Sequence, residues 1–117
     1  MSEKNPNKPL PYEEFKEIFS KVPRPCVDLI IRHNGGVILL LRKTHGWENM
    51  WHFPGNMILY RESIKDTVHR TAENEVGIKI NIVKLLDYME FHDEVQQRGF
   101  GYSVSFVFLC DFVSGKL

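Results

Sequence analysis

Cysteine is scarce in this chain, with two cysteines, Cys26 and Cys110, among 117 residues. So few cysteines exclude the disulfide-rich architecture of small secreted domains. Both lie in apolar, strand-like runs, which favours reduced core thiols over a disulfide bond. No apolar run reaches the ~18 residues that a membrane helix needs, and the polar start MSEKNPNKPLPYEE lacks the features of a secretory signal. We therefore expect a cytoplasmic protein without a membrane partner.

An excess of charge of one sign is also missing. Lysine plus arginine and aspartate plus glutamate number 15 each, so the formal net charge is +0. Bulk binding of nucleic acid needs a basic surface, and we expect no nucleic-acid partner. Hydrophobic residues make up 43% of the chain, which is enough for a core. The length fits one domain, and we predict a flexible tail at residues 1–11 followed by a domain at residues 12–117.

Two segments carry the apolar spacing of helices. The first runs from Tyr12 to Val22 and is stopped by prolines at positions 23 and 25. The second begins near Ser63, which forms a capping-box pair with Asp66, with aspartate in place of the usual glutamate or glutamine. Gly77 ends this helix as its C′ residue. The predicted core-facing stripe of the second helix is Ile64, Val68 and Ala72.

Strand patterns fill most of the remaining chain. They are predicted at residues 27–31, 37–42, 51–53, 80–88 and 102–112. Asn34-Gly35-Gly36 is typical of a hairpin turn. Further turns are predicted at Pro54-Gly55-Asn56 and at Ser114-Gly115, and residues 92–98 are expected to form a polar loop. Strands around one central helix, with a second helix at the N-terminus, predict an α/β domain.

The most informative segment runs from Trp51 to Ile78, WHFPGNMILYRESIKDTVHRTAENEVGI. It resembles the Nudix hydrolase signature G-x5-E-x7-R-E-U-x-E-E-x-G-U, in which U is a bulky aliphatic residue. The matching positions are Glu62, Arg70, Glu75, Gly77 and Ile78, and the mismatched ones are Asn56, Thr71 and Asn74. The resemblance implies the Nudix α/β/α sandwich with a mixed sheet. That fold has one more strand and a C-terminal helix, so we expect a domain truncated at its C-terminus.

The mismatches reduce the number of carboxylates that the helix presents. Successive residues of an α-helix are rotated by about 100° about its axis. Four residues therefore lie on one side of the helix, within an arc of about 140°: Arg70, Thr71, Asn74 and Glu75. In the family, glutamates at these positions hold several Mg²⁺ ions, and here Glu75 alone remains. We predict one hard cation, Mg²⁺ or alternatively Mn²⁺, bound by Glu75 and by the backbone carbonyl of Asn56. Asparagine tolerates the left-handed geometry that a glycine at this position would adopt.

The loss of all but the last glutamate resembles the GDP-mannose mannosyl hydrolase branch of the Nudix superfamily. The similarity covers roughly residues 12–113, including P-C-V-D-L-I-I at 25–31, the L-L-L-R run that ends at Arg42, and W-H-F-P-G. Such enzymes cleave nucleotide sugars at the sugar carbon and release GDP and a free sugar. The resemblance implies that Arg42 and Arg70 assist the leaving diphosphate. It also implies a homodimer formed through the N-terminal helix.

Aromatic residues near these motifs have alternative roles. We select Tyr102 as a substrate-binding residue, with packing as its alternative, and the same two roles apply to Phe100. Trp47 is either a loop anchor or a surface on which a base stacks. Trp51 is expected in the core.

Two departures from the branch leave other functions open. Met57 occupies the position of an arginine, and the histidine general base of the branch would lie beyond Leu117. One alternative is a nucleoside-diphosphate-X pyrophosphatase that cleaves between the phosphates and recruits other carboxylates, such as Glu90 or Glu94. The other is a non-catalytic nucleotide-binding domain with the same fold.

Overall fold

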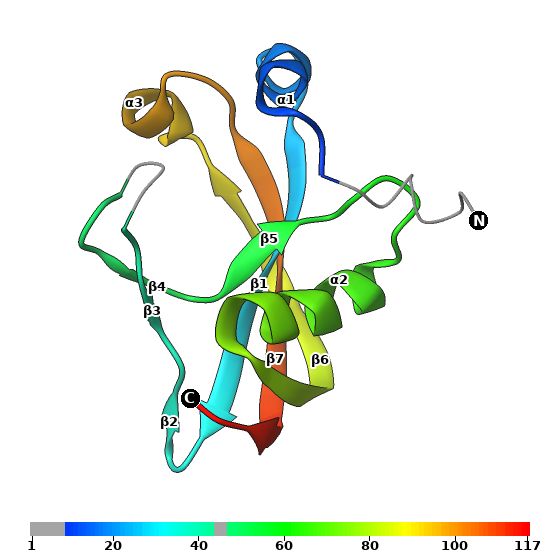
Figure 1. The fold of residues 1–117 in the computed structure, drawn as a ribbon, viewed down its shortest axis with the longest axis vertical. Coiled ribbons are helices and arrows are strands. Elements are labelled where there is room, and N and C mark those ends of the chain that lie inside the picture. Colours follow the sequence, from blue (N-terminus) through cyan, green and yellow to red (C-terminus); the bar gives the residue numbers. More distant parts are fainter. Residues whose placement is uncertain (1–8, 44–46) are drawn as a thin grey trace.

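The fold was analysed in a computed structural model, which describes residues 9–43 and 47–117. Most of the predicted tail, and His45 in the loop after Arg42, lie outside these residues. The elements, in chain order, are α1 (Tyr12–Phe19), β1 (Arg24–His33), β2 (Gly36–Val37), β3 (Leu40–Leu41), β4 (Trp51–His52), β5 (Gly55–Met57), α2 (Ile64–Thr71), a π-helix (Ala72–Val76), β6 (Ile78–Phe91), α3 (Glu94–Arg98) and β7 (Ser103–Gly115) (Figure 1). None of the helices in the described ranges is long and apolar enough to cross a membrane.

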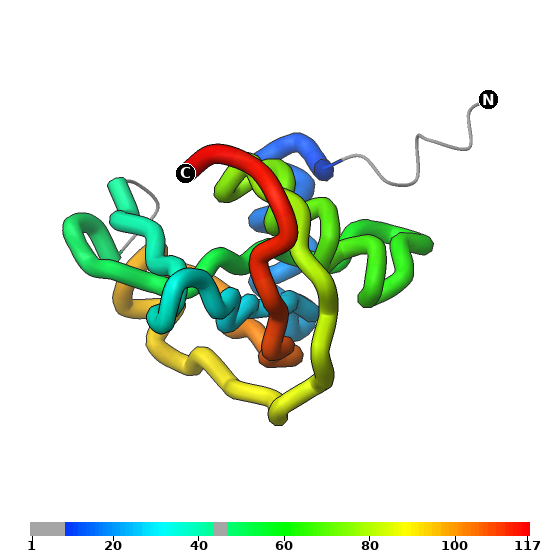
Figure 2. Tube along the Cα trace, turned by 90° about the horizontal axis from the view of Figure 1, so that it is seen from below, coloured from blue at the N-terminus to red at the C-terminus, as the bar shows by residue number. Residues whose placement is uncertain are grey.

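The main sheet is mixed, as predicted. Its strands follow the order β2-β1-β7-β6, and β5 also pairs with β1. Strands β1 and β7 run parallel, with Arg24 opposite Ser103 at one end and Arg32 opposite Asp111 at the other. The other pairs in this sheet are antiparallel. Because β1 has partners on both sides, it forms the centre of the fold, and the trace in Figure 2 shows β1 and β7 side by side.

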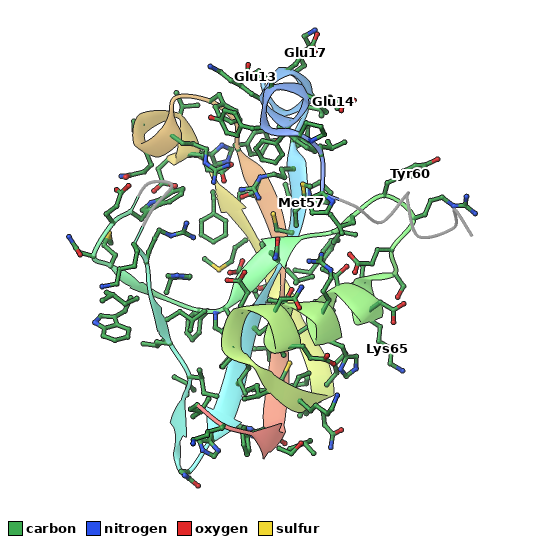
Figure 3. All side chains as sticks on the ribbon, viewed as in Figure 1. Glu13, Glu14, Glu17, Met57, Tyr60 and Lys65 are labelled. Carbon is green, nitrogen blue, oxygen red and sulfur yellow. The ribbon has the colours of Figure 1, made fainter. Side chains whose placement is uncertain are left out.

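Helix α2 covers one face of the sheet and closes the core (Figure 1). Val68 and Ala72 are fully buried there, which confirms two positions of the predicted stripe. Ile64 is 37% exposed, so its predicted place in the core is wrong. Ile64 begins the helix, and Figure 3 shows the neighbouring Lys65 at the end of α2 that extends beyond the strands. The same view shows Glu13, Glu14 and Glu17 pointing outward from α1.

The ends of the predicted helix and hairpin are confirmed. Ser63 Oγ accepts a hydrogen bond from the backbone N–H of Asp66 at 3.0 Å, which caps α2. Gly77 is left-handed with φ of 85° and ends the π-helix. Asn34 and Gly35 also have positive φ, and they connect β1 to β2. Both cysteines are free and buried, as expected.

The predicted turn at residues 54–56 is wrong, because residues 55–57 form strand β5. Tertiary pairing explains the difference: the N–H of Leu29 donates to the Pro54 carbonyl at 2.8 Å, and that of Ile58 donates to the Pro25 carbonyl at 3.0 Å. Pairing with the central strand therefore overrides the local turn preference of proline and glycine.

Four other local predictions also need correction. The strand predicted at 37–42 is divided into β2 and β3, since β3 leaves the main sheet to pair with β4. Trp51 lies on β4, in that two-stranded ribbon, and is 65% exposed instead of buried in the core. The loop predicted at 92–98 contains α3. Ser114 and Gly115 continue β7, where they pair with Lys79 and Ile78 instead of turning.

Candidate functional site

An open cavity of about 820 Å³ lies against the face of β1 opposite to α2. Segments far apart in the sequence line it, including β1, the loop after β3, β5, the π-helix, β6 and α3. Among the predicted site residues, the cavity brings together Arg42, Asn56 and Glu75. Arg70 and Tyr102 are not part of its lining.

Glu75 reaches this cavity from the π-helix and is exposed to solvent. The predicted arc of four helix positions assumed a regular α-helix, and that assumption is wrong from Ala72 onward because the π-helix has wider turns. Thr71 is instead fully buried, and its hydroxyl donates to the Thr67 carbonyl at 2.7 Å. The residue in the position of a family glutamate thus faces the core, and Glu75 is the carboxylate of this helix that lines the cavity.

The pairing of β5 with β1 determines which backbone carbonyls face the cavity. Hydrogen-bonded and non-bonded pairs alternate in an antiparallel ladder. The bonds at Pro54 and at Ile58 place Asn56, which lies opposite Val27, in the hydrogen-bonded set, so its carbonyl is directed toward β1. The carbonyl of Gly55, one residue earlier, is directed away from β1, and Gly55 also lines the cavity. Asn56 is thus an extended residue and not the expected left-handed one, and its role as a carbonyl ligand of a cation stays a prediction.

Asp28 is a cavity residue that the sequence analysis did not select. It lies opposite Gly55 in the β1–β5 register, and its side chain accepts a hydrogen bond from Ser105. Burial raises the pKa of Asp28 to about 6, although the bond from Ser105 and the charges of Arg24 and Arg42 act in the opposite direction. The sequence feature that could have identified Asp28 is that it is the one charged residue in the apolar run 27–31.

Arg42 lines the cavity beside Trp47, with the guanidinium carbon 5.5 Å from the centre of the indole ring. Trp47 is tied to α3: its indole N–H donates to Asp93 at 3.0 Å, and its backbone N–H donates to the Gln97 side chain at 3.0 Å. These contacts support the loop-anchor role of Trp47. Trp47 also lines the cavity, and stacking of a base on its ring stays a prediction.

Arg70 and Glu62 form an ion pair away from the cavity lining. Arg70 Nε lies 2.7 Å from Glu62 Oε2, and Arg70 Nη2 donates to the Met57 carbonyl at 2.7 Å. Burial acts to raise the pKa of Glu62, but hydrogen bonds from Arg70, the Leu59 N–H and the Thr67 hydroxyl outweigh it and lower that pKa. The geometry therefore favours a positioning role for Arg70 over a direct contact with a diphosphate.

The aromatic side chain of Tyr102 stacks on His92, with ring centres 4.9 Å apart and 15° between the ring planes. Phe100 is buried against Tyr12 and Phe15 of α1. Both contacts correspond to the packing alternative. No geometry places the ring of Tyr102 in the cavity, and its role as a substrate-binding residue stays a prediction.

The two extra carboxylates considered for a pyrophosphatase differ in position. Glu94 is buried and lines the cavity, whereas Glu90 is exposed and lies 2.8 Å from His92. In the part of the chain that the structure describes, no group of three or more histidine, cysteine, aspartate or glutamate side chains is placed to hold a metal ion. Glu75 and the Gly55 carbonyl are hard oxygen donors, which fits Mg²⁺ held through few protein ligands and several waters.

Comparison with known proteins gives a consistent family. The model of the NUDIX domain matches residues 22–116. The chain is 34% identical over 95 residues to the low-salt glycan biosynthesis protein Agl8 of Haloferax volcanii, which covers 80% of this chain and 61% of that protein. It is 26% identical to an ADP-ribose pyrophosphatase of Methanocaldococcus jannaschii over 81% of this chain and 54% of that protein. The chain thus spans about half to three fifths of these relatives.

A solved structure agrees with the fold. The MutT NUDIX hydrolase of Burkholderia pseudomallei superposes with a TM-score of 0.72 at 25% identity, covering 81% of this chain and 72% of that one. The shared architecture confirms the predicted α/β fold with a mixed sheet.

Proposed function

This chain belongs to the NUDIX domain family, and from that membership we propose that it is a Mg²⁺-dependent hydrolase of nucleotide sugars. The proposed substrate is GDP-mannose-like, and the products are GDP and the free sugar. The single observation that carries the proposal is the placement of Glu75, Gly55 and Arg42 around one cavity large enough for a nucleotide sugar. Mn²⁺ is the alternative cation.

We assign a different role to each of these residues. Glu75 and the Gly55 carbonyl, next to the originally predicted Asn56, would hold the cation, which supplies positive charge to the leaving diphosphate. Arg42 lines the same cavity and would contact the diphosphate directly. Arg70 would act from outside the cavity, because it holds the segment after β5 against α2 through Glu62 and Met57.

Two observations support cleavage at the sugar carbon. Glu75 is the one signature glutamate retained among the helix positions that bind several metals in the family, which disfavours the multi-metal attack on phosphorus. The Haloferax relative is named for glycan biosynthesis, a process that uses activated sugars. We further propose that residues 12–117 form the domain, that the protein is a homodimer, and that it is located in the cytoplasm.

A pyrophosphatase is the second candidate. The Methanocaldococcus relative is named an ADP-ribose pyrophosphatase, and Glu94 adds a carboxylate to the cavity lining. This activity would cleave between the phosphates and leave a nucleoside monophosphate.

Phosphorus NMR of the products separates the candidates. The protein is incubated with Mg²⁺ and either GDP-mannose or ADP-ribose. We expect GDP and free mannose from GDP-mannose, whereas GMP and mannose 1-phosphate would establish attack at phosphorus. Thermal stabilisation by nucleotide without any turnover would favour the binding domain instead.

A pair of matched variants tests the role of Glu75. Glu75→Gln should lower the Mg²⁺-dependent rate about a hundredfold, because Glu75 is the one carboxylate proposed to hold the cation. Glu73→Gln is the control, because Glu73 lies on the same π-helix but pairs with Lys79 on the surface at 3.6 Å. Equal rates for the two variants would contradict the assignment of Glu75.

A further inference from the structure

Helix α3 presents two charged side chains, Glu94 and Arg98, to the cavity. They are four residues apart, and side chains with this spacing lie on the same face of a helix, about 5–6 Å apart at their Cβ atoms. Both side chains therefore belong to the same end of the cavity lining.

Glu94 has an unused hydrogen-bond acceptor. The residue is 2% exposed, and its Oε2 forms an ion pair with Arg24. Its other oxygen, Oε1, is buried and has no hydrogen-bond partner among the described residues. A buried carboxylate oxygen without a donor is unfavourable, so a bound ligand that donates to Oε1 would be strongly favoured.

Arg98 has unused donors. Its guanidinium carbon lies 6.0 Å from the ring centre of Phe15 and 5.8 Å from that of Phe100. Within the described ranges, no hydrogen-bond acceptor occupies its N–H groups. Burial lowers the pKa of Arg98, and so do the nearby charges of Arg24 and Arg42. The two aromatic rings hold the guanidinium in place, and its N–H groups remain available to a ligand.

The position of α3 in the fold suggests which part of a ligand it meets. In Figure 1, α3 and the π-helix that carries Glu75 lie on opposite sides of β5. A diphosphate at Glu75 and Gly55 would leave the rest of a nucleotide to extend toward α3. Trp47, which is bonded to Asp93 and Gln97 at this end of the cavity, offers a flat ring there.

We infer that Glu94 and Arg98 form a recognition site for the edge of a nucleobase, an inference that rests on the proposed nucleotide substrate. The guanidinium fork offers two parallel donors. Glu94 Oε1, which is buried next to Gly101, would supply one acceptor beside them once the carboxylate turns toward the cavity. This donor-donor-acceptor order is complementary to guanine, through N7, O6 and N1–H, and to cytosine, through O2, N3 and the N4 amino group. Adenine and uracil alternate acceptor, donor and acceptor, and do not match. Because Oε1 is closed to water, the inference requires a small shift of the Glu94 side chain or of α3.

Equilibrium binding of GMP, CMP, AMP and UMP in the presence of EDTA tests the site. The four share one phosphate and one ribose, so differences among them report the base, and no metal or hydrolysis is involved. We expect GMP or CMP to bind about tenfold more tightly than AMP and UMP. Whichever of GMP and CMP binds more tightly identifies the recognised base as guanine or cytosine. Equal affinities for all four would overturn the inference.

Three variants assign the preference to the two side chains. Arg98→Lys keeps the charge and loses the fork, and should reduce the preference about tenfold. Glu94→Gln replaces a carboxylate oxygen by an amide group that can donate, so it should also abolish the preference for GMP or CMP. Gln96→Ala, an exposed position of the same helix, is the control and should bind like the parent protein. If Arg98→Lys weakens all four nucleotides equally, Arg98 is a phosphate contact and the inference fails.

Two controls keep the outcome decisive. Glu94→Gln removes the partner of Arg24 and can destabilise the fold, so thermal unfolding is recorded for each variant, and Arg98→Lys carries the test if Glu94→Gln does not fold. Free mannose is titrated as well, since a sugar hydroxyl also combines donor and acceptor. Binding of mannose that depends on Arg98, without base preference, would overturn the assignment to a base. Base preference without hydrolysis of GDP-mannose would remove the proposed activity and leave this site intact.

Discussion

Arg70 binds Glu62 at two points, with Nε 2.7 Å from Oε2 and Nη2 3.0 Å from Oε1 of the carboxylate. The same Nη2 donates to the Met57 carbonyl at 2.7 Å. The pair thereby connects the end of β5 to helix α2. Glu62 and Arg70, two of the residues that match the Nudix signature, thus maintain the shape of the loop beside the cavity.

We predict that Glu62→Gln lowers the free energy of unfolding by about 1–3 kcal/mol at neutral pH, the usual range for a hydrogen-bonded charge that loses its partner. The folded-state pKa of Glu62 is lowered. Its stabilisation is therefore fully present above the pKa of the unfolded chain and is lost as the pH falls through the folded pKa. Urea denaturation at several pH values should show the difference from the parent shrinking in acid.

The pair of Arg32 and Asp111 is the control for this prediction. It has a bond of the same 2.7 Å length, but both side chains are solvent-exposed. Asp111→Asn should cost no more than about 1 kcal/mol. Similar losses for Glu62→Gln and Asp111→Asn would contradict a special role for the buried pair.

Gly55→Ala should destabilise the protein by about 1–3 kcal/mol, as overpacking does in tight sites. An added Cβ would lie 2.5 Å from Asp28 Oδ1 and 2.9 Å from the Val27 carbonyl oxygen. Gly36→Ala is the matched control in a neighbouring strand, since its nearest contact is an ordinary 3.9 Å. Thermal and urea unfolding provide the comparison.

The double variant Asp28→Ala with Gly55→Ala identifies the clash. Removing the Asp28 side chain should recover part of the loss and no more, because the Val27 carbonyl remains. Simple addition of the two single effects would show that Asp28 and Gly55 do not interact.

Asp28 should make the protein less stable as the pH rises from about 4 to about 6. Its pKa is about 6 in the fold against 3.8 for the ordinary group, and burial is the main cause. The folded state therefore retains a proton that the unfolded chain loses, and stability falls across this window. Two pKa units correspond to about 3 kcal/mol as an upper value.

Asp28→Asn lacks this titration and provides the comparison. Urea unfolding is measured for the parent and the variant between pH 4.5 and 7.5, in EDTA so that no cation is bound. The variant should gain stability relative to the parent as the pH rises. A constant difference over this range would exclude the predicted titration of Asp28.

Cys26 and Cys110 should resist alkylation in the native protein. Burial raises the pKa of both thiols to about 11, so the reactive thiolate is rare at pH 8. Mass spectrometry after iodoacetamide treatment should find almost no label under native conditions and two labels in denaturant. Fast native labelling of Cys110, which is fully buried, would show that the core opens readily.

Local sequence signals predicted the parts of the fold that local physics determines. The cap at Ser63, the left-handed Gly77 and the hairpin at Asn34-Gly35 depend on residue types and their neighbours, and the structure contains all three. The strand at Gly55–Met57 depends instead on pairing with β1, which no local pattern encodes. The exposure of Trp51 likewise depends on the departure of β3 and β4 from the main sheet.

The candidate site shows the same division. The signature alignment predicted Asn56 and Glu75, and the resemblance to the GDP-mannose branch predicted Arg42. All three line the cavity. Asp28 was not selected from the sequence, and Glu94 was named only as a carboxylate that a pyrophosphatase could recruit. Their burial arises from the parallel pairing and from α3, which no local pattern encodes. The π-helix changed which residues share a helix face, because a π-helix has more residues per turn than the α-helix that the prediction assumed.

The parallel contact of β1 with β7 also affects how the protein folds. Arg32 donates to Asp111 across 79 positions of sequence. The pairing of β1 with β7 can therefore form only after a strand near the other end of this chain has been synthesised. Such distant pairing raises contact order and slows folding. During synthesis, the apolar strand β1 would emerge long before β7, so we expect the nascent chain to depend on protection from aggregation until residues 103–111 have left the ribosome.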